Sequence, residues 1–103
     1  MDREVTWTEG AFRDLSDAAA YIGQDSRSYA AAFVEEMLEA GASLAILGER
    51  GRMVPELGQR DVRERIVKGY RLIYAARKER IVIWGVIHGR RDLRRVLRKR
   101  PPP

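Results

Sequence analysis

The spacing of apolar residues changes once along the chain, and this change constrains the fold more than any other feature. Up to residue 47 apolar side chains recur every three or four positions, which is typical of helices that bury one side. From residue 62 to residue 87 they alternate or run without interruption, as in strands. A chain of 103 residues has room for one domain. We therefore expect residues 1–103 to form a single α+β domain.

A short strand and a first helix are predicted at the start. Val5 and Trp7 alternate with polar neighbours, which indicates a strand over residues 3–7. Thr8 then stands where a helix N-cap would, and apolar residues follow at helical spacing as far as Ile22. The pattern does not determine where the opening strand joins a sheet.

A second helix is predicted after a break at Asp25 or Ser26, and Gly48 stands at its expected C-terminal end. Its apolar stripe consists of Tyr29, Phe33, Met37, Ala40, Leu44 and Leu47. Two helices joined by so few residues form an antiparallel hairpin.

Three strands are predicted after a Gly-rich loop at 48–61. They cover residues 62–67, 70–76 and 81–87, with a tight turn at Lys68-Gly69 between the first two. The last strand is apolar on both faces, which is typical of a strand inside a sheet. The expected architecture is β-α-α-β-β-β, a helical hairpin packed on one face of a small, mostly antiparallel sheet.

The sequence predicts a short basic helix or tail at 92–103, with Asp92 as its N-cap. We expect this segment to serve target binding rather than folding, so that its removal leaves the fold largely intact. The net charge of +5 is unevenly distributed. Residues 1–49 hold three arginines against ten carboxylates, a formal −7, and residues 50–103 hold seventeen basic residues against five carboxylates, a formal +12. This asymmetry predicts an anionic partner on one face, or an acidic peptide that wraps the domain.

Several chemistries are excluded by residue content. The chain has no cysteine and one histidine, so thiolate and histidine-cluster metal sites are not expected, and no phosphate-loop or dinucleotide motif predicts a cofactor. The longest apolar run, 81–87, is far shorter than the roughly 20 residues of a membrane span. Cysteine-free composition makes the cytoplasm the expected compartment. A metal-independent ribonuclease remains open, because it needs only an acid–base pair and cations on the phosphate.

Arginines of the strands and of the segment after them form the candidate site. Because strand side chains alternate, we expect Arg63, Arg65 and Arg71 to share the open face, opposite a hairpin that covers the side of Ile66 and Leu72. The predicted target-binding residues are Arg63, Arg65, Arg71, Arg90, Arg91, Arg94, Arg95 and Arg98.

Four motifs stand in one order along the chain: GRMVPEL (51–57), VRERIV (62–67), GYRLIY (69–74) and VIHGRRDL (86–93). Together with the order of elements they resemble the RelE/ParE superfamily of toxins from bacterial type II toxin–antitoxin systems. The resemblance implies growth inhibition and plasmid stabilisation. It also implies a cognate antitoxin whose extended segment wraps the helical hairpin and the sheet, in a toxin–antitoxin hetero-oligomer.

The superfamily contains two activities, and the resemblance is closer to the second. RelE-type members cut mRNA on the ribosome; here Arg71, Arg91 and His88 would carry such an activity. However, the family's terminal tyrosine would fall at about Leu97, and no tyrosine follows Tyr74. ParE-type members are described as inhibitors of DNA gyrase. The sequence therefore predicts a gyrase inhibitor rather than an enzyme, with a RelE-like ribosome-dependent endoribonuclease as the alternative and an interaction module without toxicity as a third reading.

Overall fold

The computed structural model describes residues 2–103, and its elements agree closely with the predicted ones. They are β1 (Glu4–Trp7), α1 (Glu9–Gly23), α2 (Arg27–Leu47), β2 (Arg52–Met53), β3 (Val62–Val67), β4 (Tyr70–Ala76), β5 (Arg80–His88) and α3 (Leu93–Lys99). The α+β class and the helical hairpin are confirmed. The short β2 lies inside the segment that was expected to be a loop.

The five strands form one mixed sheet in the order β1-β5-β4-β3-β2. β1 pairs in parallel with β5, and the other pairs are antiparallel. The apolar strand β5 therefore lies inside the sheet, as predicted, with β1 and β4 on its two sides. The β3–β4 turn places both central residues at positive φ, 49° at Lys68 and 82° at Gly69. Such turns match the twist of the strands and set their register.

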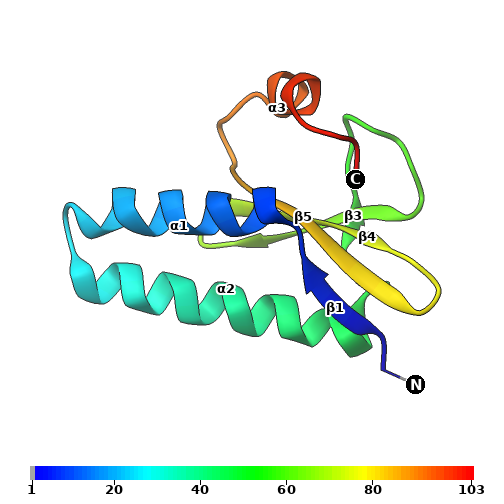
Figure 1. The fold of residues 1–103 in the computed structure, drawn as a ribbon, viewed down its shortest axis with the longest axis horizontal. Coiled ribbons are helices and arrows are strands. Elements are labelled where there is room, and N and C mark those ends of the chain that lie inside the picture. Colours follow the sequence, from blue (N-terminus) through cyan, green and yellow to red (C-terminus); the bar gives the residue numbers. More distant parts are fainter. Residues whose placement is uncertain (1) are drawn as a thin grey trace.

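Helices cover both faces of this sheet, which gives the molecule two cores (Figure 1). On one face α1 and α2 pack Leu15, Phe33 and Met37 against Leu72 and other sheet residues, forming the first core. On the other face lies α3. The second core consists of Val54, Val62, Ile73, Trp84, Ile87, Leu93 and Val96.

The second core corrects the interpretation of residues 92–103 as a segment that the fold does not need. Leu93 is 1% exposed and Val96 is 2% exposed, and both lie on the inward side of α3. The indole Nε1 of Trp84 donates to the carbonyl of Pro101 at 2.7 Å, so the chain beyond the helix also lies against the sheet. Sequence spacing alone did not place a layer on this face because α3 is only seven residues long.

Local signals account for the helix boundaries. The hydroxyl of Thr8 accepts from the backbone of α1, and Ser26, not Asp25, caps α2 in the same way. Gly48 ends α2 with a right-handed φ of −57°. A Cβ at Gly48 would lie 2.8 Å from the terminal methyl of Ile81, so the glycine permits close packing here and does not serve a left-handed turn. Within residues 2–103, no helix is long and apolar enough to cross a membrane.

Candidate target-binding surface

Arg63 and Arg65 lie on the hairpin side of the sheet. In the β3–β4 register Arg63 stands opposite Tyr74 and Arg65 opposite Leu72, and both partners belong to the first core. Arg65 donates to the hydroxyl of Ser43 in α2 at 3.0 Å, and Arg63 donates to the backbone carbonyl of Gly51 at 2.9 Å. These two arginines therefore border the hairpin instead of facing away from it.

Arg71 lies on the opposite face and is buried, with 7% of its surface exposed. It stands opposite Ile66, while its neighbour Leu72 points to the hairpin. The expectation that Arg63, Arg65 and Arg71 share an open face is wrong. That expectation assumed that Ile66 and Leu72 lie on the same side of the sheet. In the register set by the two-residue turn, Leu72 pairs with Arg65 on the hairpin side, whereas Ile66 pairs with Arg71 on the opposite side.

Two carboxylates hold the Arg71 guanidinium. Its two terminal nitrogens donate to Glu56 at 2.7 Å each, and its Nε donates to Glu64 at 2.6 Å. Glu64 is 1% exposed and also accepts from Arg52 at 2.5 Å. The hydrogen bonds from Arg71 lower the pKa of Glu56 to about 2, and both carboxylates raise the pKa of Arg71. The charge of Arg71 is thus balanced inside the protein.

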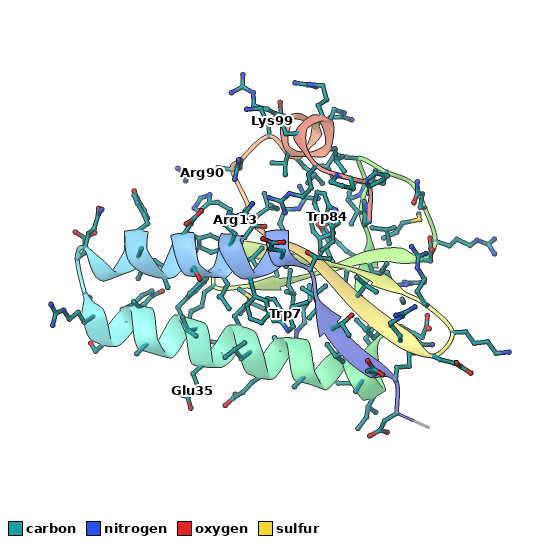
Figure 2. All side chains as sticks on the ribbon, in the orientation of Figure 1. Trp7, Arg13, Glu35, Trp84, Arg90 and Lys99 are labelled. Carbon is teal, nitrogen blue, oxygen red and sulfur yellow. The ribbon has the colours of Figure 1, made fainter. Side chains whose placement is uncertain are left out.

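The remaining predicted arginines do come together, on α3 and on the loop before it (Figure 2). We call this set the α3 surface; it consists of Arg90, Arg91, Arg94, Arg95, Arg98 and Lys99, all of them exposed. In the part of the chain that the structure describes, none of the six forms a salt bridge. Asp92 is the only carboxylate of this segment, and it caps the helix by accepting from the backbone of Arg94. Lys99 was not among the predicted site residues.

Arg100 differs from the α3 surface because it points inward and fixes the helix to the domain. Its guanidinium donates to both oxygens of Asp14 in α1, at 2.9 Å each, and lies 4.8 Å from the centre of the Trp84 ring. Asp14 also accepts from the backbone N–H of Val86 at 3.0 Å. The sequence contains no signal for this contact, since Arg100 is one of many arginines in the segment and Asp14 lies on a polar helix face.

The residues proposed for a ribonuclease do not form one site. Arg71 lines a hollow of about 390 Å³ together with Arg94, whereas Arg91 lines a separate hollow of about 560 Å³ near Trp84. His88 is exposed, and its Nδ1 accepts from the backbone of the loop at 3.1 Å. No group of three or more metal-ligating side chains occurs among residues 2–103.

The hairpin end of the molecule carries a different kind of surface. Its exposed large apolar residues are Phe12, Tyr21, Tyr29, Leu38 and Ile46. Tyr29 was predicted to lie in the buried apolar stripe of α2, but it is half exposed. The ammonium of Lys68 lies 4.9 Å from the centre of its ring. Two hollows of about 340 and 360 Å³ lie between α2 and the edge of β3 and share Arg65 and Ile66; together we call them the α2–β3 groove.

The fold and these two surfaces define a class, a small α+β protein with an acidic helical hairpin on one face of its sheet and a basic helix on the other. A solved structure described as "Chromosomal ParDE TA system from P. aeruginosa" has a similar fold, with a TM-score of 0.68. The two chains are 18% identical, over 84% of this chain and 95% of the other. The comparison with curated proteins gave no significant match.

Residues 5–93 match the model of a family described as the ParE toxin of the type II toxin-antitoxin system, parDE. The chain belongs to this family, and it is a ParE-like toxin of a type II toxin–antitoxin system. The sequence resemblance to the RelE/ParE superfamily, closer to ParE, is confirmed. The match ends at residue 93, so most of the α3 surface lies beyond it.

Proposed function

We propose that this toxin inhibits DNA gyrase without being an enzyme, and that it contacts gyrase or a gyrase–DNA complex through the α3 surface. Membership of the ParE family supports the target, because ParE-type toxins are described as gyrase inhibitors. The observation that most supports the proposal is that Arg71 is already bound by two carboxylates of the protein. The strand arginine of the YR motif is occupied by Glu56 and Glu64, and is therefore unsuited to binding a scissile phosphate.

Cleavage of RNA is disfavoured on two further grounds. Metal-independent cleavage needs cations and an acid–base group at one phosphate. Arg71 and Arg91 line different hollows, and no tyrosine follows Tyr74 to supply the proton transfer that the RelE-type terminal tyrosine would provide. We therefore propose gyrase inhibition as the function. Cleavage of mRNA is the alternative that the experiments below test.

We further propose that a cognate antitoxin covers the hairpin and the α2–β3 groove, in a cytoplasmic hetero-oligomer. Five large apolar side chains of the hairpin are exposed, and such a set is typical of a surface that a partner buries. In the groove Arg65 and Lys68 flank Ile66, which is 54% exposed. The lining also includes Glu39 and Glu36, and Glu36 already pairs with Lys68. An extended segment that places apolar residues on Ile66 and an acidic residue on Arg65 would match it.

A supercoiling assay with purified gyrase and relaxed plasmid tests the function. We expect excess toxin to inhibit supercoiling and to stabilise cleaved DNA, and a variant with Arg94, Arg95 and Arg98 changed to Gln to lose most of this effect. The matched control changes Arg27, Arg60 and Lys78 to Gln; these are exposed cations outside α3 that form no salt bridge among the described residues. It should inhibit normally.

Absence of inhibition at large excess would refute the proposal. In a parallel translation reaction, we expect the message to stay intact. Codon-positioned cuts that disappear in an Arg71→Lys variant of unchanged stability would establish the ribonuclease instead.

A further inference from the structure

We propose that the α3 surface is a binding site for the phosphate backbone of duplex DNA, which the toxin contacts directly and without gyrase. The proposal names the ligand of the surface to which we assigned target binding, and it rests on that assignment. It adds an activity of the isolated toxin, which the family match does not describe. Most of the residues involved lie after residue 93, where that match ends.

The charge density of α3 is of the same order as that of a duplex. The seven residues of α3 span about 10 Å at 1.5 Å per residue. Duplex DNA carries one charge per about 1.7 Å of its axis, or about six phosphates over the same length. α3 presents four cations over this length, and the loop before it adds Arg90 and Arg91. Five of the six are arginines, whose planar guanidinium groups bind phosphate oxygens in pairs.

These cations are available to a ligand because none of them forms a salt bridge among the described residues. Other arginines of residues 2–103 are also unpaired, but they are spread over α2, the segment that follows it, β3 and β5 and are not grouped on one surface. Many of the remaining arginines are paired. Arg3, Arg52, Arg63, Arg71, Arg77 and Arg100 each form an ion pair with a carboxylate. Asp92 lies in this segment but caps the helix, and Arg94 helps to lower the pKa of Glu56 without a direct salt bridge, while Arg71 already occupies the two oxygens of Glu56. The charges of the α3 surface therefore remain free to bind an external anion.

The surface is also held rigid from behind. Leu93 and Val96 are buried in the second core, and Arg100 joins the end of α3 to Asp14 in α1. The helix is already ordered before a ligand binds, so binding carries no free-energy cost for ordering it.

The side-chain types favour a nucleic acid over an acidic polypeptide. Protein interfaces combine charges with an apolar centre. None of the exposed large apolar residues among positions 2–103 belongs to α3 or its preceding loop; five lie on the hairpin, and Met53 and Ile66 lie on β2 and β3. In Figure 2, Arg90 and Lys99 lie on one side of the molecule and Glu35 of α2 lies on the opposite side.

The same side chains favour a duplex over a single strand. Single-stranded nucleic acids are bound by stacking their bases on exposed aromatic rings. Trp84 packs against α3 in the second core, but it is 3% exposed and lies beneath Arg100. The α3 surface therefore provides contacts to phosphates and none to bases, and binding should be independent of sequence.

Fluorescence anisotropy with a labelled duplex of about 20 base pairs tests the proposal, using the purified full chain and no gyrase. We expect binding that weakens steeply with salt, with a slope of log affinity against log salt of about −4 to −5 if most of the six cations contact phosphates. The Arg94→Gln/Arg95→Gln/Arg98→Gln variant should reduce this slope by about 3 and weaken binding at least tenfold at 100 mM salt. Thermal unfolding of each variant verifies that it is folded.

The control variant Arg27→Gln/Arg60→Gln/Lys78→Gln carries the same net charge and should lose less than threefold in affinity. An equal loss in both variants would mean diffuse attraction and would overturn the site. Competition decides the ligand class: polyglutamate or a single-stranded RNA that displaces the duplex at equal charge concentration would also overturn it. Gyrase inhibition is scored separately, so a toxin that inhibits gyrase but does not bind the duplex refutes only this inference.

Discussion

Arg71 shows how the environment of one side chain decides its role. A guanidinium with 7% of its surface exposed contributes to stability only while its partners remain charged and in place. Glu64, beside it, is almost entirely buried and depends on Arg71 and Arg52 for compensation. The cluster joins the segment before β3 to β3 and β4. We interpret Arg71 as a structural residue of this toxin.

Replacing Arg71 by Ala should therefore destabilise the protein strongly. Removing one partner of a buried ion pair costs about 3 to 5 kcal/mol, because the other charge remains buried without compensation. The control is Arg65→Ala, which removes an exposed arginine from the same pair of strands and should change the free energy of unfolding by less than about 1 kcal/mol. Urea unfolding measures both. If Arg71→Ala kept its stability but lost gyrase inhibition, Arg71 would be a target contact.

The stability of the toxin should fall in acid through Glu56. Its pKa is about 2 in the folded protein, below the ordinary value of 4.5, because Arg71 donates to its carboxylate. Because the pKa of Glu56 is lower in the folded protein than in the unfolded chain, its ion pair stabilises the fold fully at pH values above the ordinary pKa. This stabilisation is lost as the pH falls to the pKa of the folded state. The free energy of unfolding of Glu56→Gln should approach that of the wild type between pH 4.5 and 2, the window set by these two values. A difference that stays constant with pH would contradict this.

At the scale of elements, α3 combines two roles on its two sides. The inward side closes the second core with Leu93 and Val96, and the outward side carries Arg94, Arg95 and Arg98. A helix of seven residues is too short to be stable by itself, so its packing keeps the cations in place. Loss of the inward contacts should therefore also weaken the target binding that we propose for the outward side.

Leu93→Ala tests the inward side. Leu93 is 1% exposed, and truncating a buried leucine costs about 2 to 5 kcal/mol. Arg95→Ala, on the outward side of the same helix, should cost less than about 0.5 kcal/mol. Chemical denaturation of both variants is the measurement. Equal stability of the two would mean that α3 is not part of the folded core.

At the scale of the whole molecule, the two faces of the sheet carry two surfaces of opposite character. The hairpin has exposed apolar side chains and acidic residues such as Glu35 and Glu39, and α3 has only cations exposed (Figure 1 and Figure 2). The sheet lies between them, so one partner on each side could bind without direct contact with the other.

We therefore expect antitoxin binding and target binding to be separable by mutation. Leu38→Lys/Ile46→Lys should weaken binding of the antitoxin at least tenfold while supercoiling inhibition is retained, because both side chains are exposed on α2. The Arg94→Gln/Arg95→Gln/Arg98→Gln variant should behave in the opposite way. Calorimetry with the antitoxin and the supercoiling assay measure the two effects. Parallel losses in both assays would place the two partners on one surface.

Local chemistry was sufficient to predict most of the elements. The periods of the apolar residues predicted both helices of the hairpin and strands β1, β3, β4 and β5, because helical and strand spacing are properties of neighbouring residues. Caps at Thr8 and Asp92 were likewise visible in the sequence. β2 was missed because two residues, Arg52 and Met53, are too short to show alternation.

The sequence by itself determined the α+β class, the division of charge between the two halves and the cluster of arginines after β5. Only the tertiary structure decided which arginines are available. In the sequence Arg71 and Arg65 are both arginines of predicted strands and cannot be told apart. The register of the β3–β4 turn places them on opposite faces of the sheet, and Glu56 pairs with Arg71 only. Arg100 and Arg98 are likewise two positions apart, yet Asp14, 86 residues away, holds the first and not the second. Ion pairing of this kind depends on distance in space, which the order of residues does not contain.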